Sequence, residues 1–598
     1  MLFDIRKHIR NHFVLGFVPF GGNFDDFIQP FISDMKQLEQ GIVMNVMGED
    51  CWVVAGLGSV TADLPQGNDL TGIKRHGAIK GCRTCLVAKE NATDMNLDIA
   101  NISRYHHITN IQFEEMFETP TLMQQNEIAK EYGLRNSLPA LDQLIRERHL
   151  QSPQDIFHIM AGKTLKLLKL TIVMLSPEGE QSFIRVWKSF EYPYQWSKLP
   201  NPISHIESFT MADCLRLGMV IPFILNRSLS TNCLKSLELS KLQERTGLHR
   251  NQVANAIIKC WSIVAKCSQL AFKISLTNND YEELKNNLKK ERELLTWLFS
   301  DFVSLPNLHA CYHLFQHART FGTLTNTEVG VKEMVHRIFK NIVPHTNRKN
   351  IELDLLKRYT TLQSIRHLAD GGFDYQYLQP SIDFINMSRD SKHLFKDWFI
   401  IEDSLEEEES EVYSQSNQIR NIRLKKPIST HNVTIRTDSV TFLSDLALSY
   451  NSFGHHTSLI HKSCKFYENA TYVQNESYSE RKVYLHKNDV VTITTNNYNN
   501  GYAIIKAIFK HKGNDNHYYP FIYVDWFENI NRNHTKLDCP LFILHTDDNF
   551  QRKIFPLTIV DENRKTHFIH DCDARCKDND HDLANNYYLK NDFFFKSL

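Results

Sequence analysis

Hydrophobic positions recur through the middle of the chain with the period of an α-helix. Between about residues 112 and 370, apolar residues lie three, four and seven positions apart, as on one face of an amphipathic helix. The stretch 281–302 is the clearest case, and its periodic positions are Leu284, Leu288, Leu295 and Leu298. Helices are also predicted over 24–41 and 351–370, the second ending at a Gly371-Gly372 cap.

After residue 438 the pattern changes to short apolar runs separated by turn residues. This pattern predicts an all-β barrel or sandwich. The predicted strands are 482–486, 489–495, 502–511, 519–527, 540–545 and 554–560. Near the N-terminus, the Val- and Ala-rich run 51–65 predicts a buried strand that ends at its proline.

Charge is distributed in blocks between the helical and the β-rich parts. Residues 402–411 contain seven acidic side chains, and the following basic run, 420–426, contains none. Blocks of this kind are typical of a solvated linker. The sequence therefore predicts four parts: 1–110, which carries a Cys-x2-Cys loop; 111–372, which is helical; a charged linker, 373–437; and a β domain, 438–598.

Composition excludes some classes of protein. The 598 residues contain 68 Lys and Arg against 69 Asp and Glu, so the uniformly basic surface of a simple nucleic-acid binder is excluded, although local basic patches are not. No apolar run approaches the length of a membrane span, and the N-terminus lacks the features of a signal peptide. The 12 cysteines are widely spread, which favours a reducing compartment where Cys and His bind metal more often than cysteines form disulfides.

Two pairs of residues have the spacing of zinc ligands. Cys82 and Cys85 form a Cys-x2-Cys pair, which is half a zinc site or a redox pair. His309 and His313 lie four positions apart on a predicted helix, so both rings face one side, and His317 continues that face. The alternative for the histidines is an ordinary helix face. Together the two pairs would make a tertiary Cys2His2 site.

A further group of histidines and cysteines lies near the C-terminus. His567, His570, Cys572 and Cys576 are irregularly spaced and lie close to an acidic stretch. We therefore expect surface chemistry rather than a metal site there.

Two carboxylates lie beside basic stretches. Asp63 precedes a Leu-Pro at the end of the predicted strand, where α/β folds place metal ligands, although an Asp before a turn also satisfies backbone N–H groups. Glu333 precedes 17 positions without an acid. This pattern suits metal-assisted chemistry on a phosphodiester. The alternative is a helix whose early acid and late basic residues are favoured by the helix dipole. The candidate nucleic-acid contacts around these two carboxylates are Lys74, Arg75, Lys80, Arg337, Lys340, Arg348 and Lys349.

The order of these motifs resembles the DDE transposases of the CACTA (En/Spm-like) superfamily over residues 13–370. The resemblance implies an α/β RNase H-like core interrupted by a large helical insertion. It also implies that Asp63 and Glu333 are the second and third members of a Mg²⁺-binding acidic triad, and that the Cys and His pairs are those of the family, with zinc as a possible ligand. The family's first catalytic Asp has no counterpart here. We therefore expect an incomplete core and an N-terminally truncated relative without strand-transfer activity.

Residues 440–575 are similar to bromo-adjacent homology (BAH) domains in the order of their strands. This resemblance implies a BAH-like barrel with Tyr523, Trp526 and Phe527 in its core, and chromatin or histone tails as partners. The sequence thus predicts a nuclear, transposon-derived DNA- and chromatin-binding protein with no membrane and no small-molecule substrate. The alternative is a non-enzymatic chromatin or partner-protein binding module that acts through the BAH-like domain.

Overall fold

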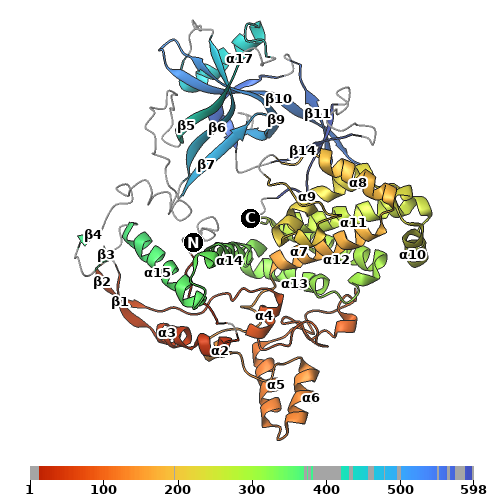
Figure 1. The fold of residues 1–598 in the computed structure, drawn as a ribbon, viewed down its shortest axis with the longest axis vertical. Coiled ribbons are helices and arrows are strands. Elements are labelled where there is room, and N and C mark those ends of the chain that lie inside the picture. The colour runs from red at the N-terminus through yellow and green to blue at the C-terminus, as the bar shows by residue number, and fades with distance from the viewer. Residues whose placement is uncertain are drawn as a thin grey trace.

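The computed structural model consists of a mainly helical part and an antiparallel β-sheet, shown in red to green and in blue in Figure 1. The described residues are 12–19, 21–46, 48–193, 196–369, 373–374, 379–380, 419–429, 435–455, 463–476, 479–494, 500–547, 551–561, 566–572 and 586–595. The Gly371-Gly372 cap, the acidic block 402–411 and Cys576 lie outside these ranges.

The N-terminal region begins with the predicted helical stretch and a hairpin. Helices α2 (Phe24–Phe27) and α3 (Gln29–Gln40) confirm the prediction for 24–41, and Gly41 ends α3 with φ 92°. Strands β1 (Ile42–Val46) and β2 (Glu49–Val53) pair antiparallel in a two-stranded sheet.

The predicted strand 51–65 is wrong in its extent, because β2 ends at Val53 and helix α4 (Leu64–Leu70) begins before the proline. Asp63 is the N-cap of α4, and its side chain accepts a hydrogen bond from the backbone N–H of Gln66 at 2.8 Å. The physical reason is that Asp at the N-cap with Pro in the first turn starts a helix. Asp63 therefore does not stand at the end of a strand.

Beyond α4 the chain forms a protruding helical hairpin, seen at the bottom of Figure 1, and then the main helical body. The hairpin consists of α5 (His106–Glu118) and α6 (Leu122–Tyr132). The body consists of α7 (Ile156–Met174), α8 (Pro177–Ser189), α9 (Met211–Ser228), α10 (Ser236–Thr246), α11 (Arg250–Ala271), α12 (Asn278–Leu298), α13 (Pro306–Phe321) and α14 (Gly330–Ile342). Helix α15 (Ile351–Ala369) lies apart from it, and its Leu355 and Tyr359 form a separate small core with Phe339 of α14.

Local capping and apolar period explain these helices. Thr210 and Thr277 start α9 and α12 with capping boxes, each closed by an Asp three residues later. The predicted helix 281–302 corresponds to α12, and its four periodic leucines are buried in the main core. Among the described residues, no helix is both long and apolar enough to cross a membrane.

The β-rich part is one 11-stranded antiparallel sheet. Its strands are β5 (Ile419–Ile428), β6 (Cys464–Glu476), β7 (Ser479–His486), β8 (Val490–Thr494), β9 (Asn500–Lys512), β10 (Tyr518–Asn533), β11 (Pro540–His545), β12 (Ile554–Pro556), β13 (Val560–Asp561), β14 (Phe568–His570) and β15 (Tyr587–Lys590). Strands therefore lie in all six predicted runs, although a 3₁₀-helix over Leu557–Ile559 interrupts the last of them. Helix α17 (Val440–Tyr450) packs on one face of the sheet, with Phe442, Leu446 and Tyr450 in a core shared with Phe509 and Phe521.

The sheet is open, so the expectation of a closed barrel is wrong for the described strands. The main strand path runs β13-β8-β9-β10-β11-β15-β14, with β13 and β14 at its two ends. Closure would require the end strands to pair with one another. Instead, Ile569 of β14 and Leu589 of β15 are buried in the core of the helical body.

The basic run 420–426 belongs to this sheet, whereas the sequence placed it in the linker 373–437. Leu424 lies opposite Ala470 in the ladder between β5 and β6, and Ile422 is buried beneath it. Lys425 and Lys426 remain exposed on this strand, which pairs only with β6 among the described strands. Lysines on an edge strand discourage pairing with other chains, which gives the charge run a structural explanation.

The last described residues join the sheet to the helical body. Phe593 packs against Phe223 of α9 at 5.5 Å between ring centroids, and Phe595 stacks on Phe272, which follows α11, at 4.9 Å. The side-chain amide of Asn591 donates hydrogen bonds to the carbonyl of Met219 at 3.0 Å and to Nδ1 of His567 at 3.1 Å. The helical body and the C-terminal segment therefore share one hydrophobic core.

Candidate metal centre

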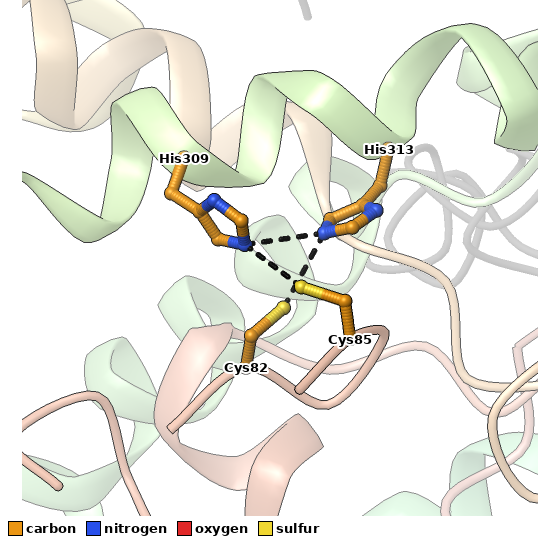
Figure 2. Close-up of side chains that lie close together, drawn as sticks. All are labelled: Cys82, Cys85, His309 and His313. Carbon is orange, nitrogen blue, oxygen red and sulfur yellow. Dashed lines mark hydrogen bonds between the residues drawn. The ribbon is translucent and has the colours of Figure 1, made fainter. Parts of the chain in front are cut away.

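The predicted Cys and His pairs come together in space. Figure 2 shows Cys82 and Cys85 on a loop below helix α13, with His309 and His313 pointing down from successive turns of that helix. All four residues are buried, and their candidate ligand atoms lie within 4.8 Å of one another. The structure thus forms a Cys2His2 cluster from residues as much as 231 positions apart.

Three separations between ligand atoms are close to those around one tetrahedral metal ion. The Sγ of Cys82 lies 3.4 Å from Nε2 of His313, the Sγ of Cys85 lies 3.2 Å from Nε2 of His309, and the two Nε2 atoms are 3.3 Å apart. Zinc bonds to nitrogen and sulfur imply tetrahedral edges of about 3.3–3.8 Å. The cluster can therefore bind a metal ion such as zinc.

Hydrogen bonds from outside the cluster orient its ligands. Nδ1–H of His309 donates to the carbonyl of Ala92 at 2.8 Å, which leaves the Nε2 lone pair directed at the cluster. The backbone N–H of Thr84 donates to Sγ of Cys82 at 3.4 Å. The buried Arg104 donates from Nε to the carbonyls of Cys82 and Cys85 at 2.8 and 3.2 Å, and so fixes the loop from behind.

The electrostatics of the cluster favour a cation. Burial would raise the pKa of Cys82, but its hydrogen bond with Cys85 and the nearby His313 and His309 lower that pKa well below its usual value. The pKa of Cys85 is raised by its hydrogen bond with Cys82 and by burial. The protein alone thus favours one thiolate, and a divalent cation would supply the charge needed for a second.

His317 continues the histidine face of α13 but does not belong to the cluster. Its ring lies next to that of His313, with 6.3 Å between centroids, and is buried. Burial lowers the pKa of His317 to about 3, so the ring is neutral at physiological pH. His317 is therefore a buried neighbour of His313 rather than a member of the ligand group.

The two predicted catalytic carboxylates both lie near one histidine, His158. Nε2 of His158 is 3.9 Å from Glu333, and Nδ1 donates to Asp155 at 2.7 Å. Burial would lower the pKa of His158, but Asp155, assisted by Glu333 and Asp63, raises it. Asp63 and Glu333 thus lie within electrostatic reach of the same imidazole.

Sequence reasoning missed Asp155 and His158. Asp155 caps α7, and its side chain also accepts a hydrogen bond from the N–H of Val329, directly before α14, at 3.0 Å. The Asp-x-x-His spacing at the start of a helix was a visible signal for the pair. Within the described part of the chain, groups of three or more close metal ligands are confined to the Cys2His2 cluster, so Asp63 and Glu333 are not gathered into a second one.

The predicted nucleic-acid contacts differ in how accessible they are. Lys340, Arg348 and Lys349 are exposed on α14 and the turn after it. Arg75 forms an ion pair with Asp69 at 2.7 Å, Lys74 and Lys80 are half-buried, and the side chain of Arg337 lies outside the described residues. The exposed predicted contacts are therefore Arg75, which is ion-paired, and the three basic residues on and after α14.

The C-terminal histidines hold the sheet to the helical body. Nε2–H of His567 donates to the carbonyl of Glu191 at 2.7 Å, and its Nδ1 accepts from Asn591. Nδ1 of His570 lies 2.6 Å from Sγ of Cys572. Because both ring nitrogens of His567 are engaged, this residue has a structural role.

The sequence was compared with models of protein families and with curated proteins. Neither comparison gave a match.

Proposed function

We propose that this chain is a DNA-binding protein related to the CACTA transposases, in which a zinc ion fastens the Cys-x2-Cys loop to helix α13. The Cys2His2 cluster carries the proposal. Its two pairs are separated by a long helical region, in the order that the resemblance requires, and their ligand atoms meet at 3.2–3.4 Å. An RNase H-like core interrupted by a helical insertion would account for this order.

The zinc ion would be structural. Four protein ligands complete a tetrahedral site and leave no position for substrate. Cys82 and Cys85 are at most 4% exposed, so water has little access to the cluster. An ion here would connect the N-terminal region to the helical body and stabilise both.

The proposed DNA contacts are the exposed basic residues around α14. Lys340, Arg348 and Lys349 are available to contact phosphates. Affinity that depends on such contacts falls as the salt concentration rises, because salt cations compete for the phosphates. The proposal implies a nuclear location. It does not include strand transfer, because among the described residues Asp63 and Glu333 are not gathered with a third metal-binding side chain.

Fluorescence anisotropy of the full zinc-loaded chain with a 30-base-pair duplex tests this function. We expect binding that weakens steeply with salt, and weaker binding for the triple variant K340A/R348A/K349A. The matched control is K285A/K289A/K290A, which removes three exposed lysines from α12. Failure of the wild-type chain to bind duplex DNA at low salt would contradict the proposal, as would equal losses in the two triple variants.

Binding to histone tails through the β-sheet is a second candidate. It is supported by the six predicted strands and by the burial of Tyr523, Trp526 and Phe527 in the sheet's cores. Titration of the full chain with unmodified and methylated histone-tail peptides tests it. Saturable binding to a peptide is expected, and no binding to any peptide of the set would exclude it.

A further inference from the structure

Helices α10 and α11 are consecutive helices joined by a short turn, as in a helix-turn-helix. Helix α10 ends at Thr246, three residues follow, and α11 begins at Arg250. Gly247 adopts φ 71° as the C-cap of α10, a left-handed conformation that favours glycine. A turn of three or four residues with a glycine is the hallmark of this motif.

The two helices pack through a small apolar interface. Leu239 and Leu242 of α10 and Val253 and Ile257 of α11 are buried in the same core, and Leu248 in the turn packs against it. The backbone N–H of His249 donates to Oε1 of Gln252 at 3.1 Å and caps the start of α11. The orientation of the second helix is therefore fixed.

The first three turns of α11 present a polar face. Asn251, Asn255 and Lys259 are exposed at i, i+4 and i+8, and Arg250 is exposed beside them. A helix that binds a protein groove would present apolar anchors at this spacing. Asn and Arg side chains instead form the paired hydrogen bonds that read adenine and guanine in the major groove.

The charge of this region suits a polyanion. No acidic residue occurs between Glu244 and Asp280, a stretch that includes all of α11. Arg250 and Lys259 lie on the exposed face, and the helix N-terminus adds a partial positive charge. Figure 1 places α10 at the outer edge of the helical body.

We propose that α10 and α11 form a DNA-reading unit whose second helix enters the major groove and contacts base edges through Arg250, Asn251 and Asn255. Lys259 contacts a phosphate. The N-terminal residues of the second helix make the base contacts in known helix-turn-helix proteins. This unit rests on the proposed function for the class of its ligand, which is DNA. Its residues lie far in sequence from the basic residues around α14.

The test has two steps. The full chain first selects duplexes from a random 20-base-pair library. Fluorescence anisotropy then measures its binding to a selected and an unselected duplex. We expect N251A/N255A to weaken binding of the selected duplex at least about 10-fold and to leave the unselected duplex nearly unaffected. R250A/K259A should weaken both and reduce the salt dependence by about one phosphate contact, that of Lys259. The control K289A/K290A removes two exposed lysines from α12.

Asn255→Asp serves as a near-isosteric second variant, because it keeps the exposed position polar and adds a repelling charge. It should weaken binding to both duplexes, and thermal melting verifies that it folds. If the wild-type chain binds no duplex, the proposed function fails together with this inference. If the wild-type chain binds and K340A/R348A/K349A is impaired while the α11 variants bind normally, only this inference is overturned.

Discussion

The ammonium group of Lys163 lies 2.7 Å from the carboxylate of Glu291, and neither side chain has exposed surface. The pair joins α7 to α12 in the centre of the helical body. Both charges were removed from water when the chain folded, so each depends on the other for compensation.

Replacing Lys163 with Met should lower the free energy of unfolding by about 3–5 kcal/mol, because it leaves the charge of Glu291 buried and unpaired. The double variant K163M/E291L should recover much of this loss, since it removes both charges and keeps an apolar volume. Urea denaturation followed by circular dichroism measures both. The control K166A breaks the exposed pair of Lys166 and Asp301 and should cost under about 1 kcal/mol. Equal losses in K163M and the double variant would contradict the prediction.

Purified chain should contain one zinc ion, and Cys85→Ser should contain less than about a tenth of that, because a tetrahedral site depends on all four ligands. Mass spectrometry of the native protein gives the stoichiometry. Cys51→Ser, in the hairpin, changes a cysteine outside the cluster and should retain the metal. Removing the metal with a chelator should lower the melting temperature of the wild-type chain but not that of C85S. A metal-free wild-type chain would refute this.

Stability should fall as the pH falls from about 6.5 to about 4, in part through His567. Burial lowers the pKa of His567 to about 4, below the value of about 6.5 for an unfolded chain. As the pH falls, His567 of the unfolded chain takes up a proton at a higher pH than His567 of the folded protein. Its contribution to the free energy of unfolding is therefore complete above pH 6.5 and declines below it, by up to about 3 kcal/mol. His567→Gln should show a shallower decline in urea denaturation across this range. The exposed His107→Gln should decline like the wild type, and a wild-type slope in H567Q would contradict the prediction.

The role of Asp63 as a helix cap predicts a specific order of stability among its variants. Asp63→Ala should lose about 1 kcal/mol, because the N–H of Gln66 loses its acceptor, whereas Asp63→Asn should lose little, since Asn caps helices as well as Asp does. Thermal denaturation measures the three proteins. Equal destabilisation of both variants would show that the negative charge itself matters, as expected for a metal ligand.

Local patterns predicted most of the elements. The leucine spacing of 281–302 and the six strand runs correspond to α12 and to strands of the sheet, because period and turn residues are properties of nearby positions. The predicted strand 51–65 was too long, although the correct signal was also local. Asp63 and Pro65 are typical of a helix start, and strand β2 ends at Val53, ten residues before Asp63.

The site was only half visible in the sequence, for a physical reason. Spacing identifies each pair of the Cys2His2 cluster, but the meeting of Cys85 and His309 depends on tertiary packing across 224 residues. The Asp155–His158 pair was missed because its significance depends on burial and on the N–H of Val329, 174 residues away from Asp155. The open form of the sheet was not visible in the sequence either, because it depends on tertiary packing of β14 and β15 against the helical body.

Phe593 and Phe595 complete a core whose other residues are synthesised much earlier. Phe593 and Phe595 fill space against Phe223 and Phe272, which leave the ribosome more than 300 residues earlier. Until residues 593–595 have been synthesised, the nascent helical body therefore exposes the apolar surface around Phe223 and Phe272. Ribosome-bound chains should depend on chaperones for this interval, because transiently exposed apolar surface promotes aggregation.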